Sequence, residues 1–278
     1  MITDTTKIKF EVSGRAMGLW NSAIKPAAKF DNEINIFSEI GPDPWTGGIT
    51  PASIKARLDN IGDGDVVVNI NSPGGDMFEG LAIYNLLRAH PGAVSVRVLG
   101  LAASAASLVA MAGKNIEIAK SGFLMIHNAW VMAIGNRLDL RAIADTLETL
   151  DAAMAGIYAD RSGAAVADIT AKLDAETWIG GQDAIDIGLA DALLPADQIA
   201  VEHDSAASAA AAAARLDQAA AKGGMPRSER RKLMQQVIAG TPRAAEDDTP
   251  RAVDEGKRYY PAAINEAAPQ LLRRISND

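Results

Sequence analysis

The chain has 278 residues, a formal net charge of −8 at pH 7 and no cysteine. Hydrophobic residues make up 48% of it and charged residues 22%, which is typical of a globular protein with one large domain and an appendage. The negative charge argues against a general nucleic-acid binder, because phosphates would be repelled. The lack of cysteine excludes disulfides and thiolate chemistry. No stretch predicts a membrane span, and residues 1–10 lack a signal-peptide pattern, so we expect a cytoplasmic protein.

Residues 1–33 form an N-terminal segment with little regular pattern. A short alternating stretch, residues 8–12, is followed by a polar loop that contains proline. Residues 33–37 predict the first strand of the main domain, because their apolar side chains alternate. Beyond a Gly/Pro-rich turn, Thr50 and Pro51 predict the start of a helix, with Thr50 as N-cap and Pro51 at the first helical position.

The stretch from Val66 to Asp76 combines a strand, a glycine corner and a helix start. Residues 66–70 are mostly β-branched and predict a strand, which ends at Ser72-Pro73-Gly74-Gly75. Asp76 then caps a pattern of apolar residues three or four positions apart. The N–H groups of such a corner point at one spot, which favours an anion site. Turn geometry alone would explain the glycines equally well.

Strand and helix patterns alternate through the rest of the main domain. This alternation predicts an α/β fold with parallel pairing inside the sheet, ending near residue 200. The longest helical pattern, residues 138–161, carries a stripe of leucine, isoleucine and methionine. Further strands are expected at 94–98, 115–118, 122–127 and 192–194, and further helices at 76–89, from the small-residue run at 100–107 onward, at 164–173 and at 182–187.

The composition changes after residue 200. Residues 201–225 form an alanine-rich stretch in which residues 206–221 are mostly alanine, which favours helix but offers little apolar area to bury, so we expect a frayed helical spacer. Residues 226–278 mix acidic and basic residues with few large apolar ones. We interpret them as a charged, partly disordered tail whose short helices could dock on a partner.

Three histidines are candidates for chemistry. His90 follows a helix and precedes Pro-Gly, which is the setting of a helix C-cap, and His203 lies beside the alanine-rich stretch, where we expect it in solvent. His127 ends an apolar strand. Because α/β folds place ligands and catalysis at the carboxyl ends of parallel strands, His127 is the catalytic candidate, with a structural histidine as the alternative.

Ser104 stands among alanines, directly after a strand and a glycine. Small neighbours let a substrate approach, and the N-terminus of the following helix favours the oxyanion that forms when a serine attacks a carbonyl. A small residue chosen for tight helix packing is the competing explanation, which applies equally to Ser107.

Four stretches of the chain carry a resemblance to a known family. Residues 71–75, 100–104, 125–127 and 184–191 read Asn-Ser-Pro-Gly-Gly, Gly-Leu-Ala-Ala-Ser, Met-Ile-His and Ala-Ile-Asp-Ile-Gly-Leu-Ala-Asp. In this order and spacing they resemble the signature blocks of the ClpP family of serine peptidases, above all the ClpP-like proteases that phages and prophages encode for head maturation. The resemblance implies a ClpP/crotonase-like α/β fold with repeated β-β-α units, and a peptidase domain over residues 34–200.

The resemblance also implies roles for particular residues. Ser104 would be the nucleophile and His127 the general base, and the N–H groups of Gly75 and Ala105 would form the oxyanion hole. Counting back from the last block without gaps puts Glu176 in the place of the third triad member. Asp174, two residues earlier, stays the alternative, because in an extended segment both side chains would point the same way.

Partners and location also follow from the resemblance. It implies a polypeptide substrate, with phage capsid or scaffold proteins as the specific expectation, and a ring-shaped homo-oligomer that meets through the helix at 138–161. No cofactor or metal is implied. Residues 1–33 show no counterpart of the family's ATPase-docking features, so we do not expect dependence on an unfoldase. The setting would be the bacterial host cytoplasm or the phage prohead.

Other classes of protein remain open at this point. A crotonase-like acyl-CoA enzyme shares the fold and the paired N–H groups but works with carboxylates. A non-catalytic capsid scaffold or assembly protein would fit the alanine-rich spacer and charged tail. A serine–lysine dyad would need a lysine near Ser104, and Lys114 and Lys120 are the candidates by number.

Overall fold

The computed structural model describes residues 8–10, 12–42 and 48–201, and isolated positions between 212 and 233. The chain divides into two compact units, Met1–Arg215 and Leu216–Asp278. Most of the expected spacer and tail lies outside the described residues, so the division into spacer and tail stays a prediction. Within the second unit, the Arg230 guanidinium is 2.8 Å from the Asp217 carboxylate.

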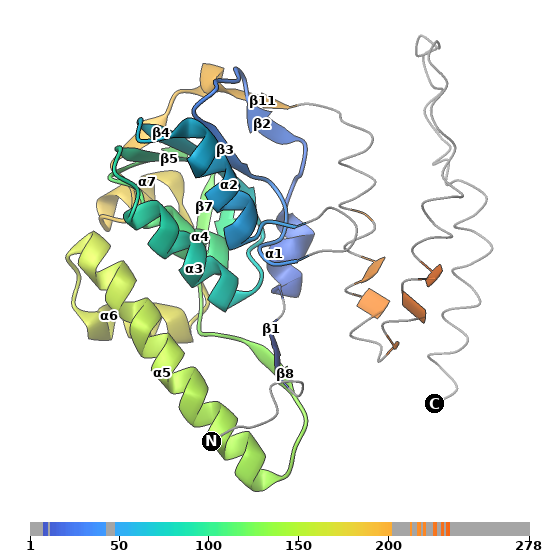
Figure 1. Ribbon diagram of the computed structural model, residues 1–278. Helices are drawn as coiled ribbons and strands as arrows, with labels where there is room; N and C mark the ends of the chain where they lie inside the picture. The colour runs from blue at the N-terminus through green and yellow to red at the C-terminus, as the bar shows by residue number, and fades with distance from the viewer. Residues whose placement is uncertain are drawn as a thin grey trace, which may run out of the picture. The chain divides into compact units, whose positions relative to one another are not determined.

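A parallel sheet forms the centre of the first unit (Figure 1). The β-branched residues on which the strand predictions were based are mostly buried in this sheet, as expected for parallel strands covered by helices. Its strands lie in the order β10-β6-β5-β4-β3, each parallel to its neighbour. Their bounds are β3 Glu33–Ile36, β4 Val66–Ser72, β5 Val94–Ala103, β6 Asn115–Ala119 and β10 Ala192–Leu194.

Strand β5 changes partner along its length. Residues 95–98 pair with β6, whereas residues 101–103 pair with β7 (Phe123–Ile126). Strand β9 (Thr177–Gly180) then lies antiparallel to β7. The sheet therefore branches at its carboxyl edge, and β5, β7 and β9 come together there.

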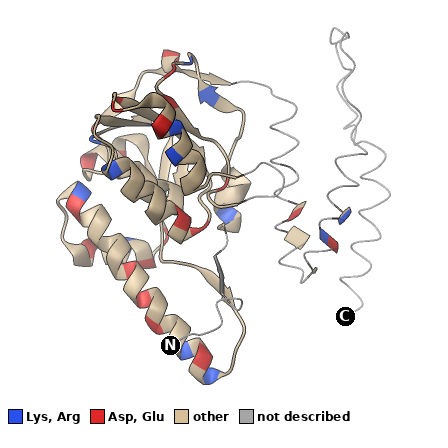
Figure 2. Ribbon diagram, in the orientation of Figure 1, with Lys and Arg blue, Asp and Glu red and all other residues tan. Residues whose placement is uncertain are grey.

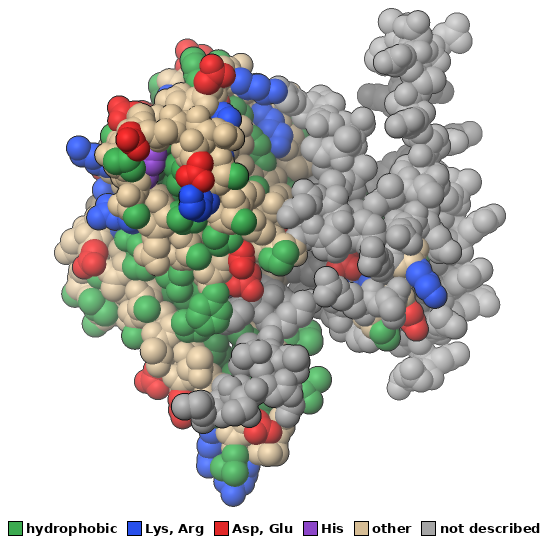
Figure 3. Space-filling view, viewed as in Figure 1, with side chains coloured by type: hydrophobic (Ala, Val, Ile, Leu, Met, Phe, Trp, Pro, Cys, Tyr) green, Lys and Arg blue, Asp and Glu red, His purple; other side chains and the backbone are tan. Residues whose placement is uncertain are grey.

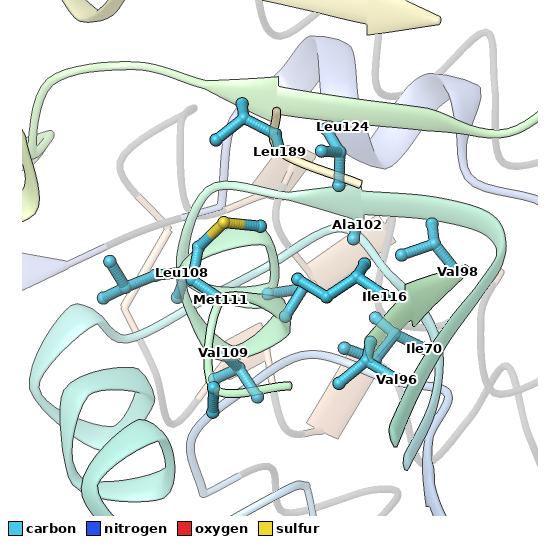
Figure 4. Close-up of a cluster of buried hydrophobic side chains, with 14 of the residues drawn as sticks. Ile70, Val96, Val98, Ala102, Leu108, Val109, Met111, Ile116, Leu124 and Leu189 are labelled. Atoms are coloured by element: carbon cyan, nitrogen blue, oxygen red, sulfur yellow. The ribbon is translucent and has the colours of Figure 1, made fainter. Parts of the chain in front are cut away.

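Helices cover the sheet and form the core with it (Figure 1). Valine and isoleucine from β4, β5 and β6 pack against alanine, leucine and valine from α4 and against Met111, which directly follows this helix (Figure 4). Long helix α5 packs against α6, and its first half, together with β8 (Val131–Ala133), projects away from the sheet (Figure 1). The helices are α2 Pro51–Ile61, α3 Met77–Arg88, α4 Ala105–Ala110, α5 Arg137–Ser162, α6 Val166–Asp174 and α7 Gly181–Asp186.

The predicted helix starts are confirmed by their caps. The Thr50 side chain accepts a hydrogen bond from Ser53 N–H, and the Ser53 side-chain oxygen accepts one from Thr50 N–H. The Asp76 carboxylate accepts from the N–H groups of Phe78 and Glu79 at the start of α3. Each cap satisfies N–H groups that have no partner inside the helix. Together with the parallel strand order, these helices confirm the expected α/β fold.

The N-terminal segment differs from the expected loop. It contains α1 (Gly14–Leu19) and β2 (Ile24–Pro26), and β2 pairs antiparallel with β11 (Ile199–Val201), which follows a short 3₁₀ turn, Ala196–Gln198. Helix α1 was missed because it is short and includes two glycines, which disfavour helix. The short alternating stretch contains strand β1 (Ile8–Phe10), which pairs antiparallel with β8, a strand that the sequence analysis did not predict.

The small-residue run after Gly100 was also partly misassigned. The sequence pattern placed residues 100–107 at the opening of a helix, but β5 continues through Ala103 and α4 begins only at Ala105. Alanine prefers helix on its own, yet pairing of residues 101–103 with β7 overrides that preference. Ser104 consequently stands between strand and helix.

Charged side chains are spread over the described surface, with acidic residues along α5 (Figure 2). Hydrophobic side chains also reach the surface (Figure 3). Several of them lie on β8, on the first turns of α5 and between the two elements, including Ile134, which follows β8 and is 79% exposed, and Leu138 of α5, which is 61% exposed. Among the helices of the described residues, none has both the length and the apolar character needed to cross a membrane.

Candidate active site

Three chain segments converge at the branched edge of the sheet. The register aligns Ala103 of β5 with Met125 of β7, and Met125 with Trp178 of β9. Because β9 runs antiparallel to β7, the residue before β9 lies opposite the residue after β7. Ser104, His127 and Glu176 therefore lie next to the adjoining ends of three neighbouring strands, β5, β7 and β9.

Ser104 occupies the corner between β5 and α4. Its φ of 54° and ψ of −125° are rare for a residue with a side chain. Its N–H donates to Met125 O at 2.8 Å, which fixes the corner to β7. The strand-to-helix corner thus presents the Ser104 hydroxyl at the sheet edge.

The Ser104 hydroxyl and the His127 imidazole are hydrogen-bonded. The distance from His127 Nε2 to Ser104 Oγ is 2.8 Å. Burial lowers the pKa of His127 below its ordinary value, and the negative charge of Glu176 opposes this effect in part. The lowered pKa favours the neutral imidazole, whose Nε2 can accept a proton from the serine.

Two glycines let another backbone segment approach Ser104 closely. Gly74 and Gly75 have φ of 92° and 149°, a region that L side chains rarely adopt. A Cβ on Gly74 would lie 2.9 Å from the Ser104 Cβ and 2.4 Å from Ala103 O, so only glycine fits there. The corner that follows β4 is therefore packed directly against the Ser104 backbone.

Backbone hydrogen bonds with Ile40 fix the orientation of the Gly74–Gly75 peptide. Ile40 N–H donates to Gly74 O at 2.7 Å, and Asp76 N–H donates to Ile40 O at 2.8 Å. In a trans peptide the N–H points opposite to the C=O, so the Gly75 N–H points away from Ile40. Gly75 and Ala105, the first residue of α4, make no backbone hydrogen bond through their N–H groups within the described residues.

The two candidate carboxylates, Asp174 and Glu176, do not lie on an extended segment as the sequence analysis assumed. The segment is not extended: Asp174 ends α6, Ala175 is helical and Glu176 has φ of 46°. The prediction that both side chains point the same way is therefore wrong. Glu176 is the carboxylate that acts on the charge of His127, but within the described residues neither carboxylate is hydrogen-bonded to the imidazole.

Asp174 instead holds the segment after His127. Its carboxylate accepts a hydrogen bond from the Asn128 side chain at 2.8 Å. One residue further, Ala129 N–H donates to Asp151 of α5 at 2.6 Å. Burial and the charge of Asp174 raise the pKa of Asp151. These two carboxylates anchor the chain that leaves the site.

Comparisons with known proteins agree with this geometry. The family model for Clp protease matches residues 57–197, which is half of the chain. The chain belongs to the Clp protease family. It is 31% identical to the ATP-dependent Clp protease proteolytic subunit 3 of Rhodococcus jostii over 145 residues, covering 51% of this chain and 71% of that protein.

Other relatives in this family are equally similar. The ATP-dependent Clp protease proteolytic subunit of Bacteroides fragilis is 33% identical over 156 residues, covering 55% of this chain and 74% of that protein. The corresponding subunit of Ligilactobacillus salivarius is 32% identical over 133 residues, which is 47% of this chain and 67% of that protein. Clp proteases of this type are serine peptidases that form rings and act on polypeptides.

The lysines considered for a serine–lysine dyad do not reach the Clp-type site. Lys114 precedes β6 and donates its N–H to Val94 O, at the opposite end of β5 from Ser104. Lys120 is exposed beyond the end of β6. Among the described residues, no cluster of three or more His, Asp or Glu side chains could hold a metal ion. The serine–lysine alternative is therefore not supported.

The histidines outside the site differ in what the structure describes. His90 Nε2 lies 2.7 Å from Gly64 O, at the end of the sheet opposite to Ser104. Its role is therefore to stabilise a turn. His203 lies outside the described residues.

Sequence reasoning missed two groups of side chains around this Clp-type site. Ser107, taken for a packing residue, bonds Ser104 O, Met125 O and the Tyr158 hydroxyl. Arg15 and Trp178 both contact Glu176, as described below. A tryptophan two residues after Glu176 was a visible signal, but Arg15 could not be linked to it without the fold.

Proposed function

We propose that this chain is a serine endopeptidase in which Ser104 is the nucleophile and His127 the general base. The observation that carries the proposal is the 2.8 Å hydrogen bond between Ser104 Oγ and His127 Nε2 at the branched sheet edge. A serine hydroxyl is a weak nucleophile at neutral pH, and an adjacent neutral imidazole activates it. The lowered pKa of His127 supports this assignment.

In the proposed mechanism, Ser104 Oγ attacks the scissile carbonyl carbon while His127 Nε2 takes the hydroxyl proton. The tetrahedral intermediate collapses to an acyl-enzyme, and His127 returns the proton to the departing amine. A water molecule then gives its proton to His127 and attacks the ester, which releases the second product and restores Ser104.

The N–H groups of Gly75 and Ala105 are the proposed oxyanion hole. Support comes from the Gly74 contacts with Ser104 and Ala105, which place this corner against the nucleophile. Support also comes from the Ile40 hydrogen bonds, which orient the Gly75 N–H. Donors fixed in advance stabilise the negative charge that develops on the carbonyl oxygen.

Glu176 is the proposed third member of the triad. Its charge favours the protonated imidazole that forms during attack, whereas Asp174 is engaged by Asn128. Closure of the gap between Glu176 and His127 Nδ1 on substrate binding would complete the triad, since catalytic hydrogen bonds often tighten in the bound complex.

Labelling with a fluorophosphonate tests the nucleophile. We expect the wild-type chain to gain one adduct on Ser104 by intact mass and peptide mapping, and Ser104→Ala to gain none. Ser121→Ala, which removes an exposed serine from the turn before β7, is the matched control and should label like wild type. Labelling elsewhere at an equal rate in Ser104→Ala would refute the peptidase mechanism.

The same experiment separates the alternative classes. A crotonase-like acyl-CoA enzyme works by acid–base chemistry on a thioester, and a scaffold protein needs no activated serine. Both therefore predict an unlabelled Ser104. Because the Ser104–His127 hydrogen bond has no purpose in either class, we favour the peptidase.

The proposed substrates are phage capsid or scaffold proteins, and the proposed assembly is a ring of identical subunits. The substrate proposal rests on the resemblance of the four sequence blocks to phage-encoded ClpP-like proteases. Co-expression with phage head proteins tests this proposal. The intact masses of all products are compared between cultures that carry the wild-type chain and cultures that carry Ser104→Ala. Head proteins trimmed only beside the wild-type enzyme would support it, and identical masses in both cultures would overturn it.

Dependence on an unfoldase is not part of the proposal. The host cytoplasm or the prohead is the proposed site of action, with residues 34–200 as the proposed peptidase domain and residues 201–278 as the proposed spacer and tail.

A further inference from the structure

We propose that Arg15 and Trp178 form a clamp that positions the Glu176 carboxylate for His127, so that Arg15 is a positioning residue of the active site. The inference rests on the proposed triad role of Glu176. It adds a residue from α1, a helix that the sequence pattern did not reveal, to the machinery of the reaction.

Both clamp residues act on the same carboxylate oxygen. The Trp178 indole N–H donates to Glu176 Oε1 at 3.2 Å. Arg15 Nη1 lies 3.9 Å from that Oε1. Neither contact involves Oε2, so the second oxygen stays available to accept the Nδ1–H of His127. A carboxylate held by one oxygen loses rotational freedom, which favours a single orientation of the other.

Arg15 and Trp178 also hold each other. The Arg15 guanidinium carbon lies 5.1 Å from the centroid of the Trp178 ring, within the range of a cation–π contact. Since Trp178 pairs with Met125 in the sheet, two residues before His127, the clamp is tied to the strand that carries the base. Three separate contacts thus converge on Arg15, Trp178 and Glu176.

Helix α1 is anchored where it can present Arg15. A second hydrophobic cluster joins α1 to the branched part of the sheet, and Trp178 packs against it. The Trp20 indole N–H also donates to Asn71 O at 2.9 Å, beside the glycine corner. The members of this cluster are Val12, Ala16, Met17, Trp20, Leu101, Ala103 and Met125.

The charges near His127 allow a signed prediction. Glu176 raises the pKa of His127, and Arg15 partly neutralises Glu176. Asp174 and Asp151 are the other carboxylates of the elements packed around this segment, and they bind Asn128 and Ala129. Removing the Arg15 charge leaves Glu176 less compensated, so the pKa of His127 rises.

The pH dependence of fluorophosphonate labelling of Ser104 measures this effect on the full chain. Labelling needs neutral His127, so the acidic limb of the rate profile reports the imidazole. We expect Arg15→Gln to move this limb upward by about 0.3 to 0.5 pH units, the scale of one partly screened charge several ångströms away. Arg15→Lys should return the limb toward wild type.

Two further variants complete the design. Trp178→Phe keeps the ring under Arg15 but loses the N–H donor, and we expect labelling to slow by about 3- to 10-fold. Arg88→Gln removes the same charge from the exposed last turn of α3 and should leave the limb unchanged.

An unmoved limb in Arg15→Gln, or a shift of equal size in Arg88→Gln, would overturn the clamp. A merely structural role would lower the melting temperature without moving the limb. Failure of the proposed function itself is recognised separately, because Ser104 would then not be labelled in any variant.

Discussion

At the scale of single residues, the site depends on backbone conformations that cost energy. Ser104 and Glu176 are the residues other than glycine that have positive φ within the described parts of the chain. Conformations of this kind cost roughly 1–3 kcal/mol and persist where surrounding contacts enforce them. For Ser104 these contacts are pairing of Ala103 with β7 and the N–H bond to Met125 O.

Substitutions of Glu176 and Asp174 are expected to have different effects on catalysis. We expect Glu176→Gln to lower kcat by about 10- to 100-fold, because the imidazolium formed during attack loses its counter-charge. The sign of the pH effect follows from the same charge: Glu176 raises the pKa of His127, so its loss lowers that pKa. The acidic limb of kcat/KM therefore moves to lower pH, opposite to the shift expected for Arg15→Gln.

Asp174→Asn is the matched control for Glu176→Gln. The amide oxygen can still accept from Asn128, so the hydrogen bond that anchors the chain after His127 survives. We expect kcat within about threefold of wild type. A larger loss in Asp174→Asn than in Glu176→Gln, measured on the same peptide substrate, would reverse the assignment of the third triad member.

At the scale of elements, a buried hydrogen-bond network joins α4, β7 and α5. Ser107 Oγ lies 2.7 Å from Ser104 O, 2.9 Å from Met125 O and 2.8 Å from the Tyr158 hydroxyl. A serine hydroxyl has one proton, and carbonyl oxygens only accept, so the Tyr158 O–H donates to Ser107. Burial raises the pKa of Tyr158, which keeps its hydroxyl protonated as this arrangement requires.

The network predicts an order of stabilities. Tyr158→Phe removes one donor, whereas the single Ser107 hydroxyl proton is still shared between the two carbonyl oxygens, so we expect a loss of about 1 kcal/mol. Ser107→Ala leaves the buried Tyr158 hydroxyl and the two carbonyls without this partner, so we expect about 2–3 kcal/mol. Urea denaturation at one fixed protomer concentration measures both, since association would otherwise shift the midpoints.

The comparison is informative because the two substitutions remove opposite ends of one bond. A Tyr158→Phe variant less stable than Ser107→Ala would contradict the donor assignment. Equal m values in the three proteins are needed for the midpoints to report stability alone.

At the scale of the whole molecule, the exposed apolar residues of α5 and β8 need a partner surface. Met132 lies on β8, Ile134 directly follows it, and Leu138 and Leu140 lie on α5; all four are between 39% and 79% exposed. Large contiguous apolar surface is uncommon on monomers and marks interfaces. This observation supports the proposed ring assembly through the long helix.

We expect the double variant Ile134→Glu/Leu138→Glu to lower the oligomer mass, because two buried carboxylates without partners would oppose association. Light scattering coupled to size-exclusion chromatography measures the mass. Leu19→Glu, at a 62% exposed position of α1, is the control and should leave the mass unchanged. An assembly of unaltered mass in the double variant would exclude this surface as the interface.

Much of the fold was predictable because its signals are local. Each of these signals can be recognised from residues that are close together in the sequence. They include the β-branched run of β4, the caps Thr50 and Asp76, and the apolar stripe of α5. Where local preference and tertiary pairing disagreed, as in the alanines that end β5, the pairing prevailed. The glycines and short length of α1 concealed a helix that only packing stabilises.

The α/β class, the family resemblance and the candidates Ser104 and His127 could be predicted from the amino-acid sequence, because glycine corners, caps and short motifs are encoded by neighbouring residues. The folded chain was needed to show that Glu176 rather than Asp174 acts on the charge of His127, and that Arg15 belongs to the same cluster. Those facts depend on where α6 ends and on how α1 packs against the sheet. Both are set by contacts between segments far apart in the chain, which no local pattern records.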